Sequence, residues 1–362
     1  MQATSRNREG HLYTNDDWPS DNREHNPGIL PPPIITNCRT YHTHLYNSDG
    51  TIFTDTEGID TFEVIVPLGV NMPIHDEFSC TTRSSNVDKM RPTSNSGIHH
   101  EAPTDYAYWL IRSTRDNGIE GAIYGRVYHG RILKSLAASD GSLKWEITSD
   151  RIAIKTMQHD KIVQGMEVDG FTEDPYKEIA AMQYIQNHLT AGNQASQDEY
   201  DEVLSVEELK TRTEQIMMNH NIMTLIDALS SETHLFHVMP FCDGGDMFNL
   251  LDDAFPEPEA RYFFKQILNA VETLQKVGIC HRDISLENLV ATRSGCVLAV
   301  AIDFGLCLRI PYIMNEHGNR QRCLMRVRRG KWGKVSCPTY TCSQIGKVLY
   351  KHLTHNFYQA IL

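Results

Sequence analysis

Charged and amide side chains gather in one short stretch, CHRDISLENLV at residues 280–290, which lies between apolar ends. Arg282 and Asp283 are adjacent there, and Glu287 and Asn288 follow closely. Side chains of these types can accept a proton or hold a cation. A polar turn between a helix and a strand is often only solvated, however. The stretch therefore becomes informative only if other parts of the chain supply partners.

Two further stretches supply candidate partners. CVLAVAIDFG (296–305) has the character of a buried strand that ends in Asp303 and a glycine. RIAIKTM (151–157) is typical of a strand, with Lys155 between apolar residues. Once the stem of this lysine is buried, its ammonium group requires a partner. Cys337 and Cys342 have no second pair nearby, so we expect no zinc site.

Composition restricts the classes of function. The net charge of −12 argues against nucleic-acid binding and against an anionic membrane surface. No apolar run approaches the roughly 20 residues that span a bilayer, and the start, MQATSRNREG, lacks an apolar signal core. Nine cysteines without regular spacing favour a reducing compartment, the cytoplasm, with the nucleus left open.

The first 105 residues differ in amino-acid composition from the rest. They are rich in Asn, Asp, Ser, Thr, His and Pro, a composition that buries too little apolar area to order its backbone. We therefore expect region 1–105 to be mostly disordered, with one possible strand at TFEVIVPLGV (61–70).

From residue 106 the patterns alternate between strands and helices. YAYWLIRS, AIYGRVYHGRIL, RIAIKTM, TLIDAL and HLFHVMPF have strand character. EDPYKEIAAMQYIQNHL predicts an amphipathic helix, and PEPEARYFFKQILNAVETLQKVGI is the clearest helix, with Gly278 as its stop. We expect inserts at 133–150 and 187–215, the second more consistent with a solvated excursion than with a helix. The layout is α+β, with a seam near residue 240.

In this order the motifs resemble those of the eukaryotic protein kinase family. HRDISLEN (281–288) is similar to the catalytic loop of that family, and DFG (303–305) to its metal-binding triplet. AIK (153–155) is similar to its strand lysine motif, and Glu178 in KEIAAM corresponds to its helix glutamate. The resemblance runs from about residue 110 to 305. It implies a two-lobed protein-kinase-like fold, with a β-rich N-lobe at 106–240 and a hinge and partial helical C-lobe at 241–362.

The resemblance assigns roles for phosphoryl transfer from ATP to Ser/Thr hydroxyls of a protein substrate. Lys155 would bind the α- and β-phosphates and be held by Glu178. Asn288 and Asp303 would supply oxygen ligands to Mg²⁺. Asp283 would orient the acceptor hydroxyl and take its proton.

The same resemblance places the rest of the ATP site. The hinge would offer backbone groups at Phe241 and Cys242 to adenine, with Met239 behind them, and Asp246 would face the ribose. The remaining nucleotide contacts would come from Gly125, Val127, Ala153 and Val290. Arg282 would bind a phosphate on the activation segment, for which Ser336, Thr339, Tyr340 and Thr341 are the candidate acceptors.

Three departures from the family pattern keep alternatives open. The phosphate loop EGAIYGRV (120–127) has Glu120 and Ala122 at the first two glycine positions. Ser285 stands where a lysine is common in serine/threonine kinases. Only 57 residues follow Gly305 and no A-P-E occurs among them, so we expect an incomplete C-lobe. A non-catalytic nucleotide-binding or scaffolding module, or an inactive truncated kinase, is the alternative to a kinase.

Overall fold

The computed structural model describes residues 5–6, 12–13, 30–73, 104–112, 120–137, 143–168, 173–191, 205–250, 255–293, 297–309, 312–314 and 320–322. The chain divides into two compact units. One unit contains residues 32–161 and 227–238, and we call it the sheet unit. The other contains residues 162–226 and 239–362, together with 1–31, and we call it the helical unit.

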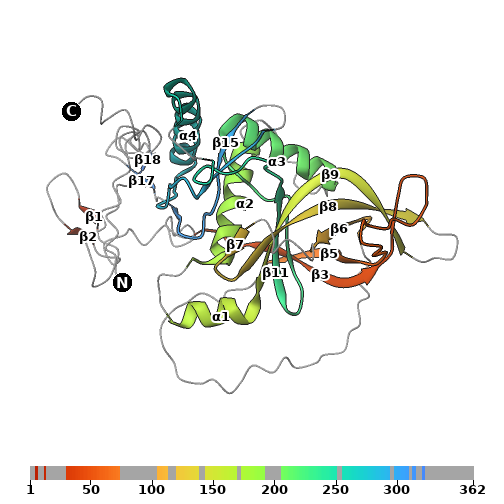
Figure 1. Ribbon diagram of the computed structural model, residues 1–362. Coiled ribbons are helices and arrows are strands. Elements are labelled where there is room, and N and C mark those ends of the chain that lie inside the picture. The colour runs from red at the N-terminus through yellow and green to blue at the C-terminus, as the bar shows by residue number, and fades with distance from the viewer. Residues whose placement is uncertain are drawn as a thin grey trace, which may run out of the picture. The chain divides into compact units, whose positions relative to one another are not determined.

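A nine-stranded sheet dominates the sheet unit (Figure 1). Its strands are β3 (Ile34–Thr43), β4 (Leu45–Tyr46), β5 (Phe62–Pro73), β6 (Tyr106–Ile111), β7 (Glu120–Ala122), β8 (Gly125–Ala137), β9 (Leu143–Gln158), β10 (Asp227–Ser230) and β11 (His234–Pro240). The order of hydrogen-bonded neighbours is β4-β9-β11-β10-β3-β5-β6-β8-β7, and β8 also pairs with β9. In Figure 1, β8 and β9 run alongside one another as a long antiparallel pair.

Consecutive residues of β5 and β6 are buried, so both faces of these strands contribute to the core; Ile65 and Tyr108, for example, are fully buried. Val64 and Val66 on β5, and Ala107 and Trp109 on β6, are buried on one face. They belong to a cluster that draws on five strands. Its buried members are Leu45, Phe62, Val64, Val66, Ala107, Trp109, Leu133 and Trp145. The core of this unit is therefore built partly from residues that precede β6.

Two expectations about this part of the chain are wrong. Region 1–105 was expected to be mostly disordered, with one possible strand at 61–70. That strand is confirmed as β5, but β3 and β4 are also paired strands of the sheet. Polar composition misled because the buried positions are sparse and alternate with exposed polar residues along β3. Region 133–150 was expected to be an insert. Its described residues instead extend β8 and β9, with Leu133 opposite Ile147 and Ala137 opposite Leu143.

The helical unit carries most of the described helical residues. The helices are α1 (His159–Val168), which begins in the sheet unit, α2 (Pro175–Ala191), α3 (Val206–His220) and α4 (Glu257–Val277). Its short strands are β12 (Gly245–Asp246), β13 (Ile279–Cys280), β14 (Leu289–Ala291), β15 (Ala299–Ala301), β16 (Leu308–Arg309), β17 (Tyr312–Met314) and β18 (Arg320–Arg322). Strands β12, β14 and β15 form one small sheet, while β13–β16 and β17–β18 pair separately. Helix α4 packs beside β15 (Figure 1). Near the N-terminus, β1 (Ser5–Arg6) pairs with β2 (Leu12–Tyr13).

The helix ends follow local capping rules. The predicted helix at 173–189 is confirmed as α2, and Asp174 caps it by accepting from the amides of Tyr176 and Lys177 at 3.0 and 3.2 Å. The predicted helix at 256–279 is confirmed as α4. It ends at Gly278, which takes a left-handed φ of 88°.

The expected solvated excursion at 187–215 is wrong for its last part. Residues 206–220 form α3, whose first turn is fixed by a capping box. Ser205 accepts from the amide of Glu208 at 3.3 Å, and the Glu208 carboxylate accepts from the amide of Ser205 at 2.8 Å. Val206, Ile216 and Met217 then bury one face of the helix. Residues 192–204 of the expected insert lie outside the described residues.

Within the described residues, none of the helices combines the length and the apolar character that crossing a bilayer requires. The expected activation-segment acceptors Ser336, Thr339, Tyr340 and Thr341, and the tail after Lys334, lie outside the described residues.

Candidate functional site

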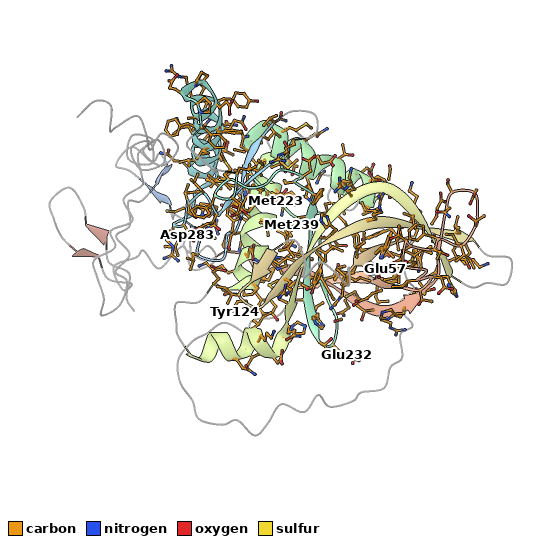
Figure 2. The ribbon with its side chains drawn as sticks, viewed as in Figure 1. Glu57, Tyr124, Met223, Glu232, Met239 and Asp283 are labelled. Carbon is orange, nitrogen blue, oxygen red and sulfur yellow. The ribbon has the colours of Figure 1, made fainter. Side chains whose placement is uncertain are left out.

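The loop at 281–288 is positioned by secondary structure on both sides. Helix α4 ends at Gly278, β13 follows at once, and β14 begins at Leu289. Strand β13 pairs with β16, and β14 pairs with β15, so the strands that flank the Asp303 triplet hold the two ends of the loop. Figure 2 labels Asp283 on this loop.

Asp283 and Asn288 are joined within the loop. The side-chain amide of Asn288 donates to the carboxylate of Asp283 at 2.9 Å and to the Asp283 carbonyl at 3.0 Å. The carboxylate is therefore held in one orientation by a residue five positions away. Because Asn288 uses its amide nitrogen for these bonds, its amide oxygen is not consumed by them.

Asp303 is connected to the same loop through the backbone. The amide of Ile302 donates to the carbonyl of Asn288 at 3.1 Å, which fixes the start of the DFG triplet beside Asn288. The Asp303 carboxylate accepts from the amide of Gly305 at 3.1 Å. Thus three of the expected residues, Asp283, Asn288 and Asp303, are brought together by the pairing of β14 with β15.

Backbone strain marks this site. Among the described residues, the non-glycine positions with positive φ are Asn221, Arg282 and Asp303. Asn221 caps the end of α3, whereas Arg282 (φ 72°) and Asp303 (φ 62°) lie in the two loops just described. Such conformations cost of order 1–3 kcal/mol each and cluster at functional sites.

The burial and the hydrogen bonds of His281 indicate a structural role. It is buried, its Nε2 donates to the Ile302 carbonyl at 2.8 Å, and its Nδ1 accepts from the amide of Asp283 at 3.4 Å. These contacts assign a neutral ring protonated at Nε2. Burial lowers the pKa of His281 and so stabilises that neutral form. Its ring packs on the fully buried Phe304, with the centroids 4.9 Å apart.

Helix α2 contacts the DFG glycine through its N-terminus. The amide of Asp174 lies 3.5 Å from the carbonyl of Gly305, and a Cβ placed on Gly305 would lie 2.9 Å from the Cβ of Glu173. Glu178, one turn further along α2, is buried, and its charge acts on His281. The expected helix glutamate is therefore near the catalytic-loop histidine within the helical unit.

Arg282 lies on the exposed side of the loop. Its Nε donates to the carbonyl of Leu306, just past the DFG triplet. Its charge also acts on Lys177 and on the buried Cys307. Burial lowers the pKa of Lys177 and raises the pKa of Cys307 to about 12, so this thiol is protonated and unreactive at neutral pH.

Ser285 does not replace the charge of the lysine expected at its position. Its hydroxyl donates to the carboxylate of Glu287 at 3.3 Å. The described loop therefore has a neutral hydroxyl, bonded to a nearby acid, at the position where the resemblance led us to expect a lysine.

The hinge residues of the helical unit pack on a sulfur-rich cluster. Buried Met217, Met223 and Val300 form its centre, and Met239, Cys242, Val290, Leu298 and Ile302 pack against it. Met223 and Met239 are labelled in Figure 2. The thiol of Cys242 lies 3.9 Å from the sulfur of Met217, and burial raises the pKa of Cys242 to about 12.

Asp246 adjoins this cluster. It is the strand partner of Val290, and its carboxylate accepts from the backbone and side-chain amides of Asn249 at 2.7 and 2.6 Å. Three residues expected at the nucleotide site thus lie close together: Cys242 of the hinge, Asp246 and Val290. Phe241 is half-buried between Pro240 and Cys242.

The sheet unit gathers the other expected residues on one face. Val127 lies directly opposite Lys155, and Gly125 and Ala153 occupy the next positions of the same parity on β8 and β9. Side chains directly opposite each other in an antiparallel pair point to the same side. Lys155 is half-buried between the buried Ile154 and Thr156.

The phosphate-loop region is a tight hairpin. Ala122 pairs with Gly125, so Ile123 and Tyr124 form the turn. Ile123 is exposed, whereas Tyr124 is buried and its carbonyl accepts from the amide of Gln158 at 3.2 Å. A Cβ on Gly125 would lie 1.8 Å from the carbonyl oxygen of Thr156. Glycine is therefore required here by strand packing.

Asn288 and Asp303 offer an amide oxygen and a carboxylate, the donor types that Mg²⁺ prefers. Such a site uses few protein ligands and depends on phosphate oxygens for the rest. Among the described residues, no group of three or more His, Cys, Asp or Glu side chains is placed to hold a metal ion. The pair fits Mg²⁺ delivered with a nucleotide.

Some contacts near the site were missed from sequence. No role was assigned to Asp174 from the sequence, although an Asp before a proline at N1 is a capping signal. Lys177 gave no signal, because its closeness to Arg282 and Cys307 arises from tertiary packing. The expected pairing of Lys155 with Glu178 stays a prediction, because the two residues belong to different units.

Comparison with known proteins places a similarity over the segment that contains this site. Residues 190–317 match the family described as the protein kinase domain. The serine/threonine-protein kinase SRK2G of Arabidopsis thaliana is 34% identical over 131 residues, which are 36% of this chain and 34% of that protein. SAPK7 of Oryza sativa subsp. japonica is 34% identical over 131 residues, 36% of this chain and 33% of that protein.

A third relative, the CBL-interacting serine/threonine-protein kinase 9 of Arabidopsis thaliana, is 32% identical over 137 residues, 35% of this chain and 30% of that protein. The chain thus spans about a third of the length of the curated relatives it matches. Its similarity to the protein kinase domain is carried by residues 190–317, the segment that contains the loop at 281–288 and the DFG triplet.

Proposed function

We propose that this chain is a serine/threonine protein kinase that transfers the γ-phosphate of ATP to a hydroxyl of a protein substrate. The observation that carries the proposal is the arrangement of Asp283, Asn288 and Asp303, which two hydrogen-bonded loops hold together in the helical unit. Phosphoryl transfer depends mainly on positioning and on neutralising charge, and this arrangement suits both.

Each residue has a defined task in this proposal. Asp283 accepts the proton of the substrate hydroxyl while Asn288 holds its carboxylate in place. Asn288 and Asp303 would hold Mg²⁺, which would neutralise phosphate charge when bound. Lys155 contacts the α- and β-phosphates and pairs with Glu178.

The nucleotide base and sugar are assigned in the same way. Backbone groups at Phe241 and Cys242 bind adenine, and Asp246 binds the ribose hydroxyls. Gly125, Val127 and Ala153 cover the nucleotide from the sheet unit, and Val290 supports it from the helical unit. The cytoplasm remains our proposed location, supported by the free thiols of Cys38, Cys242, Cys280 and Cys307.

One experiment separates transfer from simple nucleotide binding. The purified chain is mixed with labelled ATP, Mg²⁺ and a generic protein substrate, and its melting temperature is measured with and without ATP. A kinase transfers label and is stabilised by ATP, and Lys155→Ala weakens both effects. Stabilisation without transfer would support a non-catalytic nucleotide-binding module. A non-cooperative melt that ATP leaves unchanged would indicate a fragment that does not fold stably.

A further inference from the structure

The order of strands in the sheet unit returns to its starting point. From β9 the hydrogen-bonded neighbours run through β11, β10, β3, β5 and β6 to β8, and β8 pairs directly with β9. These seven strands therefore form a closed barrel, which has no free edge along the ring. Only β10 and β11 lie within residues 190–317, the segment that matches the protein kinase domain. Strands β3 and β5 come from region 34–73.

The hairpin of β3 and β5 closes the ring through two short seams. Within the hairpin, nine residue pairs run from Ile34–Pro73 to Thr43–Phe62. On one side β3 joins β10 in parallel at Thr36 and Asn37. On the other side β5 joins β6 in antiparallel fashion at Val64 and Ile65. Main-chain bonds at the seams are few, so side chains must hold the hairpin in place.

Polar side chains connect strands that the hairpin separates. The hydroxyls of Tyr106 and Tyr108 on β6 both donate to the carboxylate of Asp227 on β10, each at 3.1 Å. In the sheet order, β3 and β5 lie between β6 and β10. The buried Cys38 of β3 is close enough for the charge of Asp227 to act on its thiol. Asp227 therefore gathers groups from both sides of the closing hairpin.

Apolar side chains connect the hairpin to β8 and β9. Val64 of β5 and Leu45 of β4 are fully buried in the same cluster as Leu133 of β8 and Trp145 of β9. The indole N–H of Trp145 also donates to the hydroxyl of Tyr41 on β3 at 2.9 Å. Burial of these large apolar side chains therefore adds to the few main-chain bonds of the seams in holding the hairpin in place.

We propose that the β3–β5 hairpin is a positioning element for the strands that carry Val127 and Lys155. By closing the barrel it fixes the register and curvature of β8 and β9, so that residues 34–73 are required for productive nucleotide binding. The second part of this inference rests on the proposed function. The first part concerns only the barrel.

The test compares two matched substitutions in the full chain. Val64→Asp places a charge at a fully buried hairpin position, and Ile59→Asp makes the same change at an exposed position just before the hairpin's second strand. Hydrogen exchange is measured for peptides covering 125–137 and 143–158. We expect Val64→Asp to speed exchange in both segments by about tenfold or more and to weaken ATP binding about tenfold. Ile59→Asp should change neither.

A second measurement does not depend on the Val64→Asp variant folding. A protease site is placed between Pro73 and Thr104 of the full chain, and the folded protein is cleaved there. A closed barrel keeps the two pieces together on gel filtration until denaturant is added. Pieces that separate without denaturant would overturn the proposal.

The two parts fail in different ways. Faster exchange confined to residues 34–73, with β8 and β9 unchanged, would show that the hairpin does not hold these strands. Faster exchange in β8 and β9 with unchanged ATP affinity would refute the second part, that residues 34–73 are required for nucleotide binding. If the unaltered chain shows no response to ATP, the proposed function fails, and the exchange and cleavage results still decide whether the hairpin closes the barrel.

Discussion

The side-chain amide of Asn288 donates to the carboxylate of Asp283 at 2.9 Å, so the candidate base and a candidate metal ligand are held by each other. The carbonyl of Asn288 in turn accepts from Ile302, next to Asp303. One residue therefore links the proton acceptor to the metal-binding triplet. Loss of Asn288 should disturb both.

Gly125→Ala should destabilise the sheet unit. The added Cβ would lie 1.8 Å from the carbonyl oxygen of Thr156, so β8 and β9 must separate locally. Overpacking of this kind costs about 1–3 kcal/mol. Gly121→Ala is the matched control, because nothing lies within 4 Å of its added Cβ. Thermal melts of both variants measure the difference, and equal melting temperatures would contradict a packing role for Gly125.

Ser205→Ala should destabilise α3. It removes the hydroxyl that accepts from the amide of Glu208, and such cap losses cost about 1 kcal/mol. Glu208→Ala removes the reciprocal bond to the amide of Ser205. Because the two bonds form one capping box, the double variant should lose less than the sum of the single losses. Denaturant unfolding of the four proteins gives these free energies, and strict additivity would show that the two side chains act independently.

The capping box also shows where sequence reasoning fell short. S-x-x-E at 205–208 is a recognised start signal, yet the acidic composition around it was weighed more heavily. The helices α2 and α4 were predicted well because a proline, acids and an apolar face agree at each. The strands β3 and β4 were missed because buried positions along β3 are sparse, and because β10 and β9, which also pair with them, lie far away in sequence. Closure of the barrel in the sheet unit depends on long-range contacts that local composition does not encode.

The candidate site was more predictable than the fold around it. Asp283, Asn288 and Asp303 are close in sequence and lie in the loops that precede β14 and follow β15, so their convergence follows from one hairpin of the small sheet. By contrast, the packing reason for a glycine at position 125 could not be predicted from the sequence. The absence of a side chain lets Gly125 approach the backbone of Thr156, a contact that depends on the register of β8 and β9.

His281 should lower the stability of the folded chain at acidic pH. Its pKa is lowered in the folded chain, so below the ordinary histidine value of 6.5 the unfolded chain binds a proton that the folded chain does not. This contribution to stability is complete above about pH 6.5 and is lost as the pH falls below it. His281→Gln cannot titrate and should have a flatter melting profile between pH 5 and 7.5. An unchanged slope would rule out His281 as its source.

The contribution of Asp227 to stability should have the opposite pH dependence. Burial raises its pKa from 3.8 to about 6, although bonds from Tyr106 and Tyr108 oppose this shift. Between about pH 4 and 6 the folded chain therefore binds the extra proton, and the stability from this group declines as the pH rises through that window. Asp227→Asn should remove the decline. Melting temperatures measured from pH 4 to 7 check this, and a variant that keeps the wild-type decline would contradict it.

Asp283→Asn tests the central claim most directly. The substitution keeps the size of the side chain and removes its ability to accept a proton, so transfer of labelled phosphate to a protein substrate should fall by a factor of about 10²–10⁴. The ATP-dependent rise in melting temperature should persist, because nucleotide capture is assigned to other residues. Phosphate transfer that proceeds at the wild-type rate in the Asp283→Asn protein would contradict the assignment of Asp283 as the base.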